Sequence, residues 1–204
     1  MRFPFVVGLA ALAFAVAGYG IYLTWPAPSA PLSQSGSRQV SVAHPAGLQA
    51  AADAVRGFRL LANAPLAPDV KLKTEAGETV TLADYRGKVV LLNLWATWCP
   101  PCKREMPDLN ALQTAFAGRD FVVLPVATGR QGAEEPSQFL RKRSLDALST
   151  VYDPGRGMLD VLGIDSLPST FLIDRDGRML GGVLGMIDWN SDAVKTLIET
   201  VLKG

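Results

Sequence analysis

The chain has 204 residues, 49% of them hydrophobic, and its 20 basic and 19 acidic side chains leave a formal net charge of +1 at pH 7. This balance argues against a nucleic-acid-binding surface, which needs a clear excess of lysine and arginine. No internal repeat is visible, and residues 65–204 are long enough for one domain with a single hydrophobic core.

Residues 1–25 predict a single-pass membrane anchor. After Arg2 the segment is uncharged and rich in Ala, Val, Leu and Phe, and about 20 such residues cross a bilayer as a helix. The next basic residue is Arg38, so we expect the N-terminus in the cytoplasm and the rest of the chain outside. Ala15-Val16-Ala17 would suit a cleaved signal peptide, but the apolar run continues to Trp25 and favours an uncleaved anchor.

Residues 26–64 are expected to link the anchor to the domain. Residues 26–45 contain four prolines and five serines, a composition typical of a semi-extended tether. Residues 47–63 have the pattern of a weak amphipathic helix, with Leu48 and Phe58 among its apolar positions. We expect this helix to pack on the domain; the alternative is more tether.

Residues 65–204 predict an α/β domain. The expected elements are two short strands at 70–73 and 79–81, a helical turn at 82–85, a strand at 89–94, a helix after Cys99 that ends at Gly118, a strand at 121–127, a loop and helix over 129–149, a strand hairpin at 170–173 and 179–184, and a last helix that Ser191 begins. The β-α-β start implies a parallel strand pair with a right-handed crossover. The closing hairpin makes the central sheet mixed, with helices on both faces.

Cys99 and Cys102 are the only cysteines of the chain, and they directly follow the expected strand at 89–94. A C-x-x-C pair between a strand and a helix is typical of a redox dithiol. The sulfur of Cys99 then lies at a helix N-terminus, where free N–H groups and the helix dipole favour a thiolate, so we expect a lowered pKa and an exposed position. Cys99 would attack a client disulfide, and Cys102 would release the client from the mixed disulfide.

Two other interpretations of the cysteine pair are disfavoured. A structural disulfide across C-x-x-C closes too short a loop to constrain much of the chain. A zinc site wants four ligands, whereas the only histidine is His44 in the linker. We therefore expect no metal and no other cofactor.

The residues around the dithiol predict how its reducing strength, its proton exchange and its contact with a client are set. Pro100 and Pro101 offer no backbone N–H to the Cys99 sulfur, and a less stabilised thiolate makes the dithiol a better reductant; alternatively they are only helix-starting prolines. Glu105 either exchanges a proton with Cys102, one helical turn away, or is an exposed first-turn acid that stabilises the helix dipole. Trp98 is expected to cover the sulfurs or to contact the client.

Two segments, 87–107 and 167–177, resemble the thioredoxin superfamily, and more closely its membrane-tethered, extracytoplasmic TlpA/ResA-like branch. Residues 185–195 are most similar to the TlpA members. The resemblance implies a thioredoxin-like fold with an N-terminal β-hairpin, and it identifies residues 129–149 as the helical insert of this branch.

The resemblance also implies roles for individual residues. It implies that Cys99 is the attacking cysteine and Cys102 the resolving one. Pro168 matches the proline that is cis in this family, beside the dithiol, and the backbone of Leu167 would pair with an extended segment of the client. Glu105 matches an acidic residue that this branch places near the active site. Asn93 stands where thioredoxin itself has a buried acid, so thioredoxin's proton relay from that position does not transfer.

The implied protein is a thiol-disulfide oxidoreductase anchored in the inner membrane by one helix, with its domain in the periplasm. It would reduce cysteine pairs of a copper chaperone, of the copper-bearing oxidase subunit or of apocytochrome c, and a membrane thiol carrier would supply electrons. A Cu(I) chaperone is the alternative. Related copper chaperones, however, have C-x-x-x-C and a distal histidine, and residues 65–204 contain no histidine. A peroxidase shares the fold, but the W-C-P-P-C context does not suit it.

Overall fold

The computed structural model describes residues 44–129 and 134–204. The expected membrane anchor at 1–25 and residues 26–43 of the expected linker lie outside these described residues. Within the two described ranges, no helix is both long enough and apolar enough to cross a membrane.

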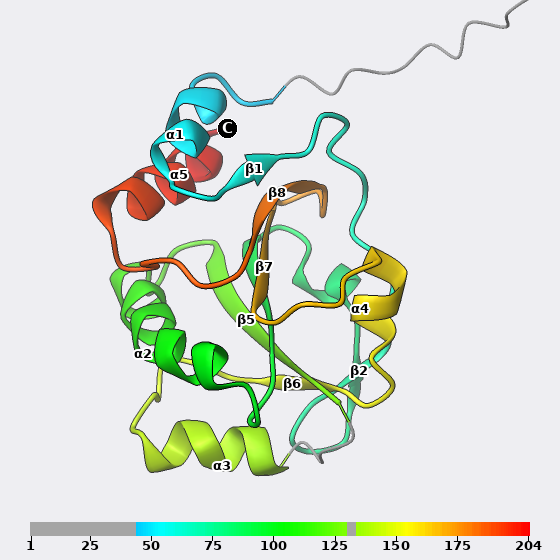
Figure 1. Cartoon of the computed structure of the whole chain (residues 1–204). Coiled ribbons are helices and arrows are strands. Elements are labelled where there is room, and N and C mark those ends of the chain that lie inside the picture. Colours follow the sequence, from blue (N-terminus) through cyan, green and yellow to red (C-terminus); the bar gives the residue numbers. More distant parts are fainter. Residues whose placement is uncertain (1–43, 130–133) are drawn as a thin grey trace, which may run out of the picture. The chain divides into compact units, whose positions relative to one another are not determined.

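The described strands form one mixed sheet of eight strands in the spatial order β1-β8-β7-β4-β5-β6-β2-β3 (Figure 1). In chain order the elements are α1 (Leu48–Ala54), β1 (Arg59–Leu60), β2 (Leu72–Lys73), β3 (Thr79–Val80), a 3-10 turn (Leu82–Tyr85), β4 (Val89–Trp95), α2 (Pro100–Ala115), β5 (Phe121–Thr128), α3 (Glu134–Lys142), β6 (Val151–Asp153), α4 (Gly157–Leu162), β7 (Ser169–Ile173), β8 (Met179–Leu184) and α5 (Asp192–Lys203). The parallel β4–β5 pair and the antiparallel β7–β8 hairpin confirm the predicted mixed sheet.

Strand β4 lies at the centre of the sheet, parallel to β5 and antiparallel to β7. All seven of its residues are buried, as expected for a strand that is covered on both faces. Its side chains alternate between two cores. Leu91 and Trp95 enter the core beneath α1, α2 and α5, whereas Leu92 and Leu94 enter the core beneath α4. Helices therefore cover both faces, and the active-site turn follows the end of the central strand.

The packed part of the molecule begins before residue 65, where the sequence places the start of the domain. Helix α1 packs against α5, as expected, and its Leu48 is fully buried. The helix is shorter than the 47–63 that the sequence predicts: it ends at Ala54, Gly57 turns the chain with a φ of 86°, and Arg59–Leu60 form a strand. Strand β1 extends the sheet by pairing antiparallel with β8, Arg59 opposite Gly182. The neighbouring Gly181 permits this approach, because a Cβ there would lie 2.5 Å from the carbonyl oxygen of Arg59. A glycine pair inside an expected strand was the sequence signal for this pairing.

Two elements between the helical insert and the closing hairpin were not predicted. Strand β6 has only three residues, too few for a hydrophobic pattern to be visible. Helix α4 begins where the carboxylate of Asp153 accepts the backbone N–H groups of Gly157, at 3.0 Å, and of Met158, at 2.8 Å. The side chain therefore satisfies N–H groups that a helix start leaves free. The insert itself contains α3, as expected.

Candidate active site

The two cysteines form a disulfide at the start of α2, with sulfurs 2.07 Å apart. Cys99 is the N-cap residue of the helix, and its sulfur accepts the backbone N–H of Cys102 at 3.3 Å. The two residues between them are Pro100 and Pro101, which carry no N–H. The turn is therefore poor in donors, as the sequence predicts, and the N–H of Cys102 is the contact that it makes to the sulfur.

The predicted exposure of Cys99 is wrong for the disulfide form. Cys99 is only 4% exposed and Cys102 is fully buried. The disulfide ties the first sulfur to a residue that belongs to the core beneath α2, which explains the difference. Of the two residues only Cys99 keeps any exposed surface, so an incoming thiolate reaches the disulfide on that side.

Pro168 occupies the position that the resemblance implies. The Leu167–Pro168 peptide bond is cis. Strand β7 starts at the next residue, Ser169, which pairs with Leu94 near the end of β4. The carbonyl of Pro168 accepts the N–H of Gly185 at 2.8 Å, which joins the turn to the end of β8. The cis-proline thus lies beside the end of the strand that leads into the dithiol, with Leu167 half-buried next to it.

Exposed apolar side chains flank the site. Trp98 is 62% exposed, and its indole nitrogen lies near Gly129. Leu184 and Met186, at the end of β8, are 66% and 47% exposed. They flank Gly185, which is bonded to the cis-proline turn. These two residues were not predicted as site residues, although apolar side chains at the end of a strand were a visible signal.

Glu105 is not an exposed first-turn acid; that alternative is wrong. The side chain projects from α2 into the interior and is 1% exposed. One carboxylate oxygen accepts the indole N–H of Trp189 at 2.9 Å, and the other accepts the amide of Asn93 at 2.8 Å. The pKa of Glu105 is raised to about 7, because burial and the like charge of Asp108 raise it by more than the two hydrogen bonds lower it. A carboxyl with a pKa near neutrality suits proton exchange.

Asn93 connects three elements beneath the dithiol. Its side-chain amide donates to Glu105 on α2 and to the hydroxyl of Thr170 on β7, each at 2.8 Å. Its carbonyl oxygen is buried without a hydrogen-bond partner. The acid of this site therefore lies on the helix, and the strand supplies the amide that holds it. The sequence singled out Trp189 only as part of a resemblance, and its contact with Glu105 was not foreseen.

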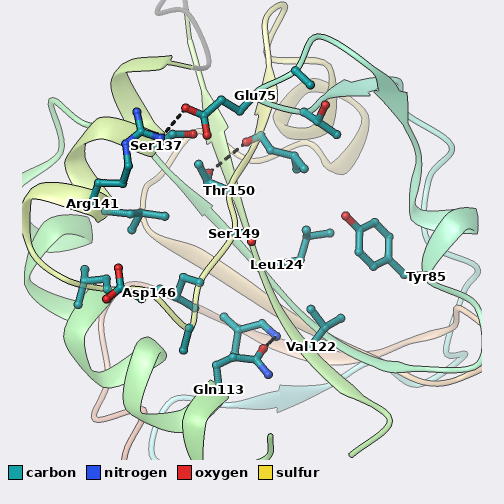
Figure 2. Close-up of a pocket in the computed structure, with 18 of the residues that line it drawn as sticks. Glu75, Tyr85, Gln113, Val122, Leu124, Ser137, Arg141, Asp146, Ser149 and Thr150 are labelled. Carbon is teal, nitrogen blue, oxygen red and sulfur yellow. Dashed lines mark hydrogen bonds and ion pairs between the residues drawn. The ribbon is translucent and has the colours of Figure 1, made fainter. Parts of the chain in front are cut away.

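A cleft of about 690 Å³ lies away from these residues, between β5, the β2–β3 hairpin and the chain before β6 (Figure 2). It exists because β6 pairs with β5 only from Val126 onward. Side chains occupy the remaining edge of β5: Gln113 accepts the N–H of Val123 at 2.6 Å, and Thr150 donates to the carbonyl of Pro125 at 3.0 Å. Pro125 has no N–H of its own. This edge is closed to an added strand, and no predicted site residue lines the cleft.

Thiol-disulfide exchange is the chemistry that a dithiol at a helix start, with a cis-proline beside it, performs. The chain is accordingly a thiol-disulfide oxidoreductase with a thioredoxin-like fold. Residues 65–180 match the model of the AhpC/TSA family, and the chain belongs to this family.

Relatives of known name agree with this class. The thiol-disulfide oxidoreductase ResA of Geobacillus thermodenitrificans is 34% identical over 135 residues, which cover 66% of this chain and 75% of the relative. ResA of Bacillus subtilis is 32% identical over 119 residues, 58% of this chain and 65% of the relative. The sequence-predicted resemblance to the ResA-like branch is therefore confirmed at the level of thiol-disulfide oxidoreductases.

Solved structures agree with the fold. A Chlorobium tepidum protein described as a thiol:disulfide interchange protein DsbE is 30% identical with a TM-score of 0.60, and the match covers 68% of this chain and 96% of that one. The exposed lipoprotein thioredoxin of Streptococcus pneumoniae is 30% identical with a TM-score of 0.55, over 65% of this chain and 99% of that one.

Proposed function

We propose that the chain is a reductant of the TlpA type, anchored in the inner membrane, which reduces disulfides of client proteins in the periplasm. The observation that carries the proposal is the donor-poor helix start. With prolines at positions 100 and 101, the Cys99 sulfur accepts a backbone N–H from Cys102 alone within the first turn. A thiolate with few donors is less stable, so the dithiol gives up its electrons more readily than a dithiol in a donor-rich turn.

The reaction proceeds in two exchanges. The Cys99 thiolate attacks one sulfur of the client disulfide, a mixed disulfide forms, and the second client sulfur leaves as a thiolate that takes up a proton. Cys102 then passes its thiol proton to the Glu105 carboxylate and attacks the Cys99 sulfur. The Cys99–Cys102 disulfide forms, and the first client sulfur leaves. The client gains two electrons and the chain loses two, which leaves it in the disulfide form described above.

The rim of the site supports a protein client rather than a small thiol. Trp98, which directly precedes Cys99, presents an apolar side chain to solvent, and so do Leu184 and Met186, which flank the Gly185 that bonds to the cis-proline turn. Trp98 is a residue type that often carries binding energy in interfaces. An extended client segment would pair with the backbone at Leu167 and lay its side chains against these three.

The proposed membrane location rests on the sequence. The apolar run within residues 1–25 supports an anchor, and the pneumococcal relative is an exposed lipoprotein. The proposed clients are a copper chaperone, the copper-bearing oxidase subunit or apocytochrome c, and the proposed electron donor is a membrane thiol carrier. A donor is required, because each turnover leaves the dithiol oxidised.

Trapping tests the proposal. The full chain with Cys102→Ser should stop at the mixed disulfide, and mass spectrometry of the trapped species identifies the client on Cys99. The matched control is Cys99→Ser, which should trap nothing. A reduction potential near that of a disulfide-forming catalyst, about −120 mV, would overturn the reductant assignment. Consumption of hydrogen peroxide by Cys99 without any client protein would favour the peroxidase alternative instead.

A further inference from the structure

Trp189 is a buried tryptophan on a surface connection. It lies between β8 and α5, and its neighbours Asp188 and Asn190 are exposed, whereas Trp189 itself is 1% exposed. Connections usually run over the surface, so a fully buried side chain there needs a partner. That partner is Glu105, whose carboxylate accepts the indole N–H at 2.9 Å, 84 positions away in the sequence.

The surroundings of Glu105 leave few groups that could take the place of this contact. On α2 it follows Cys102 by one helical turn, and Asp108 acts on it as a like charge. From β4 the facing group is the uncharged amide of Asn93. On the β8–α5 connection the charged residue is Asp188, which acts on Asp108. Among the described residues, the charged group that acts on Glu105 is Asp108, and the groups that stabilise its buried charge are two neutral N–H donors.

We propose that Trp189 is the positioning residue of this site: its indole N–H fixes the Glu105 carboxyl and sets the pH at which Cys102 can pass on its proton. The inference rests on the proposed function, since it assigns Glu105 as the proton acceptor of the second exchange. Loss of the indole N–H leaves one carboxylate oxygen buried with no donor. The protonated carboxyl then becomes more favourable, and the pKa of Glu105 rises above its value of about 7.

The first test measures the titration of Glu105 directly. The full chain, labelled with carboxyl-13C glutamate and kept in the disulfide form, is titrated by NMR with and without Trp189→Phe; the spectrum of Glu105→Gln identifies the signal. No cysteine thiol titrates in this form, so no thiol contributes to the midpoint. The midpoint should rise by about half to one pH unit, the size expected for one lost hydrogen bond. An unchanged or lowered midpoint would overturn the proposal.

Trp95→Phe is the matched control. Trp95 is also fully buried, but its indole N–H donates to Thr150, at 3.4 Å, and not to Glu105. This variant should leave the Glu105 midpoint unchanged. Should Trp189→Phe fail to fold, β-(3-benzothienyl)alanine at position 189 keeps the shape of the indole and replaces its N–H by sulfur, and the same shift is expected.

The second test separates positioning from mere packing. The rate at which Cys102 resolves a preformed mixed disulfide is measured against pH. In Trp189→Phe the acid limb of this profile should shift to higher pH by the same amount as the NMR midpoint, and the rate should recover once the pH is raised. In a Glu105→Gln background the same substitution should leave the profile unchanged. A loss of rate by one factor at all pH values, in both backgrounds, would show that Trp189 acts through packing only and would overturn the proposal.

The two tests also distinguish the inference from the function on which it rests. The NMR midpoint needs no client. A shifted midpoint together with a failure to trap or reduce any client protein would overturn the proposed function, while the contact between Trp189 and Glu105 would keep its assigned effect.

Discussion

The carboxyl of Glu105 and the amide of Asn93 meet at 2.8 Å in a place where neither residue is more than 1% exposed. Burial dominates the electrostatics of the pair, because the pKa of Glu105 is raised to about 7 in spite of the hydrogen bonds that favour the ionised form. The relationship has consequences for stability as well as for proton transfer, since a pKa that differs between the folded and unfolded states makes folding depend on pH.

We predict that the protein loses stability as the pH rises toward neutrality. Folding raises the pKa of Glu105 from 4.5 to about 7, so its contribution is fully present below 4.5, is lost progressively as the pH rises, and amounts to about 3 kcal/mol. Urea unfolding of the disulfide form from pH 4 to 8 measures it. The difference between the wild type and Glu105→Gln should change with pH across this window. Two parallel stability curves would contradict the prediction.

Pro101→Ala should make the dithiol more oxidising. The second helical position contributes one of the N–H groups that an N-cap side chain accepts, so alanine there adds a donor to the Cys99 sulfur. We expect the reduction potential to rise by an amount on the order of 30 mV, measured by equilibration with glutathione. Pro100→Ala is the control, because the N–H of the first position does not reach the cap and should change the potential less. Equal shifts in both variants would argue against this account.

Trp98→Ala should weaken client binding without altering the dithiol. An exposed tryptophan beside the reactive residue is expected to act as an anchor, so KM for the trapped client should rise by at least about tenfold, while the reduction potential stays the same. Met186→Ser should act in the same direction with a smaller effect. Val161→Ser is the matched control, because Val161 is 64% exposed on α4 and should leave KM unchanged. An equal loss in the control would indicate a general effect of surface apolarity.

Gly181→Ala should destabilise the protein by about 1–3 kcal/mol. The added Cβ would lie 2.5 Å from the carbonyl oxygen of Arg59 and 2.6 Å from the ring of Phe58, so β1 must shift away from β8. Denaturant unfolding measures the loss, and hydrogen exchange should show faster exchange in β1. Gly155→Ala has open space around it and should be nearly neutral. A tolerated alanine at 181 would mean that β1 contributes little to the fold.

The parts of the fold and site that could be predicted are those encoded by local pattern. The apolar run at 89–94 and the C-x-x-C pair after it each carry a short-range signal, and the structure has β4 and the disulfide in these places. The cis bond before β7 was expected from the family resemblance, because the local sequence indicates only a turn with a proline. Strand β6 was missed because its three residues are too few to show a hydrophobic period. Helix α4 was missed because a single side chain, the carboxylate of Asp153, caps its start.

The environment of Glu105 could not be predicted for a different reason. Its burial depends on Trp189 from the β8–α5 connection and on Asn93 from the central strand, which only the tertiary structure brings together. Helical spacing showed that Glu105 follows Cys102 by one turn, and this left proton exchange with Cys102 and an exposed first-turn acid as equal alternatives. The burial of Cys99 likewise depends on the disulfide and on the core beneath α2.

The packing of α1 and β1 on the domain limits how far the active site can travel. Because Leu48 is already part of the core and Arg59 is already paired with β8, residues 46–64 add nothing to the length of a tether. With the proposed anchor ending at residue 25, residues 26–44 can span at most about 65 Å when fully extended, whereas residues 26–64 would span about 130 Å. With the proposed anchor, the dithiol would therefore reach only clients whose cysteines come within this shorter distance of the membrane surface.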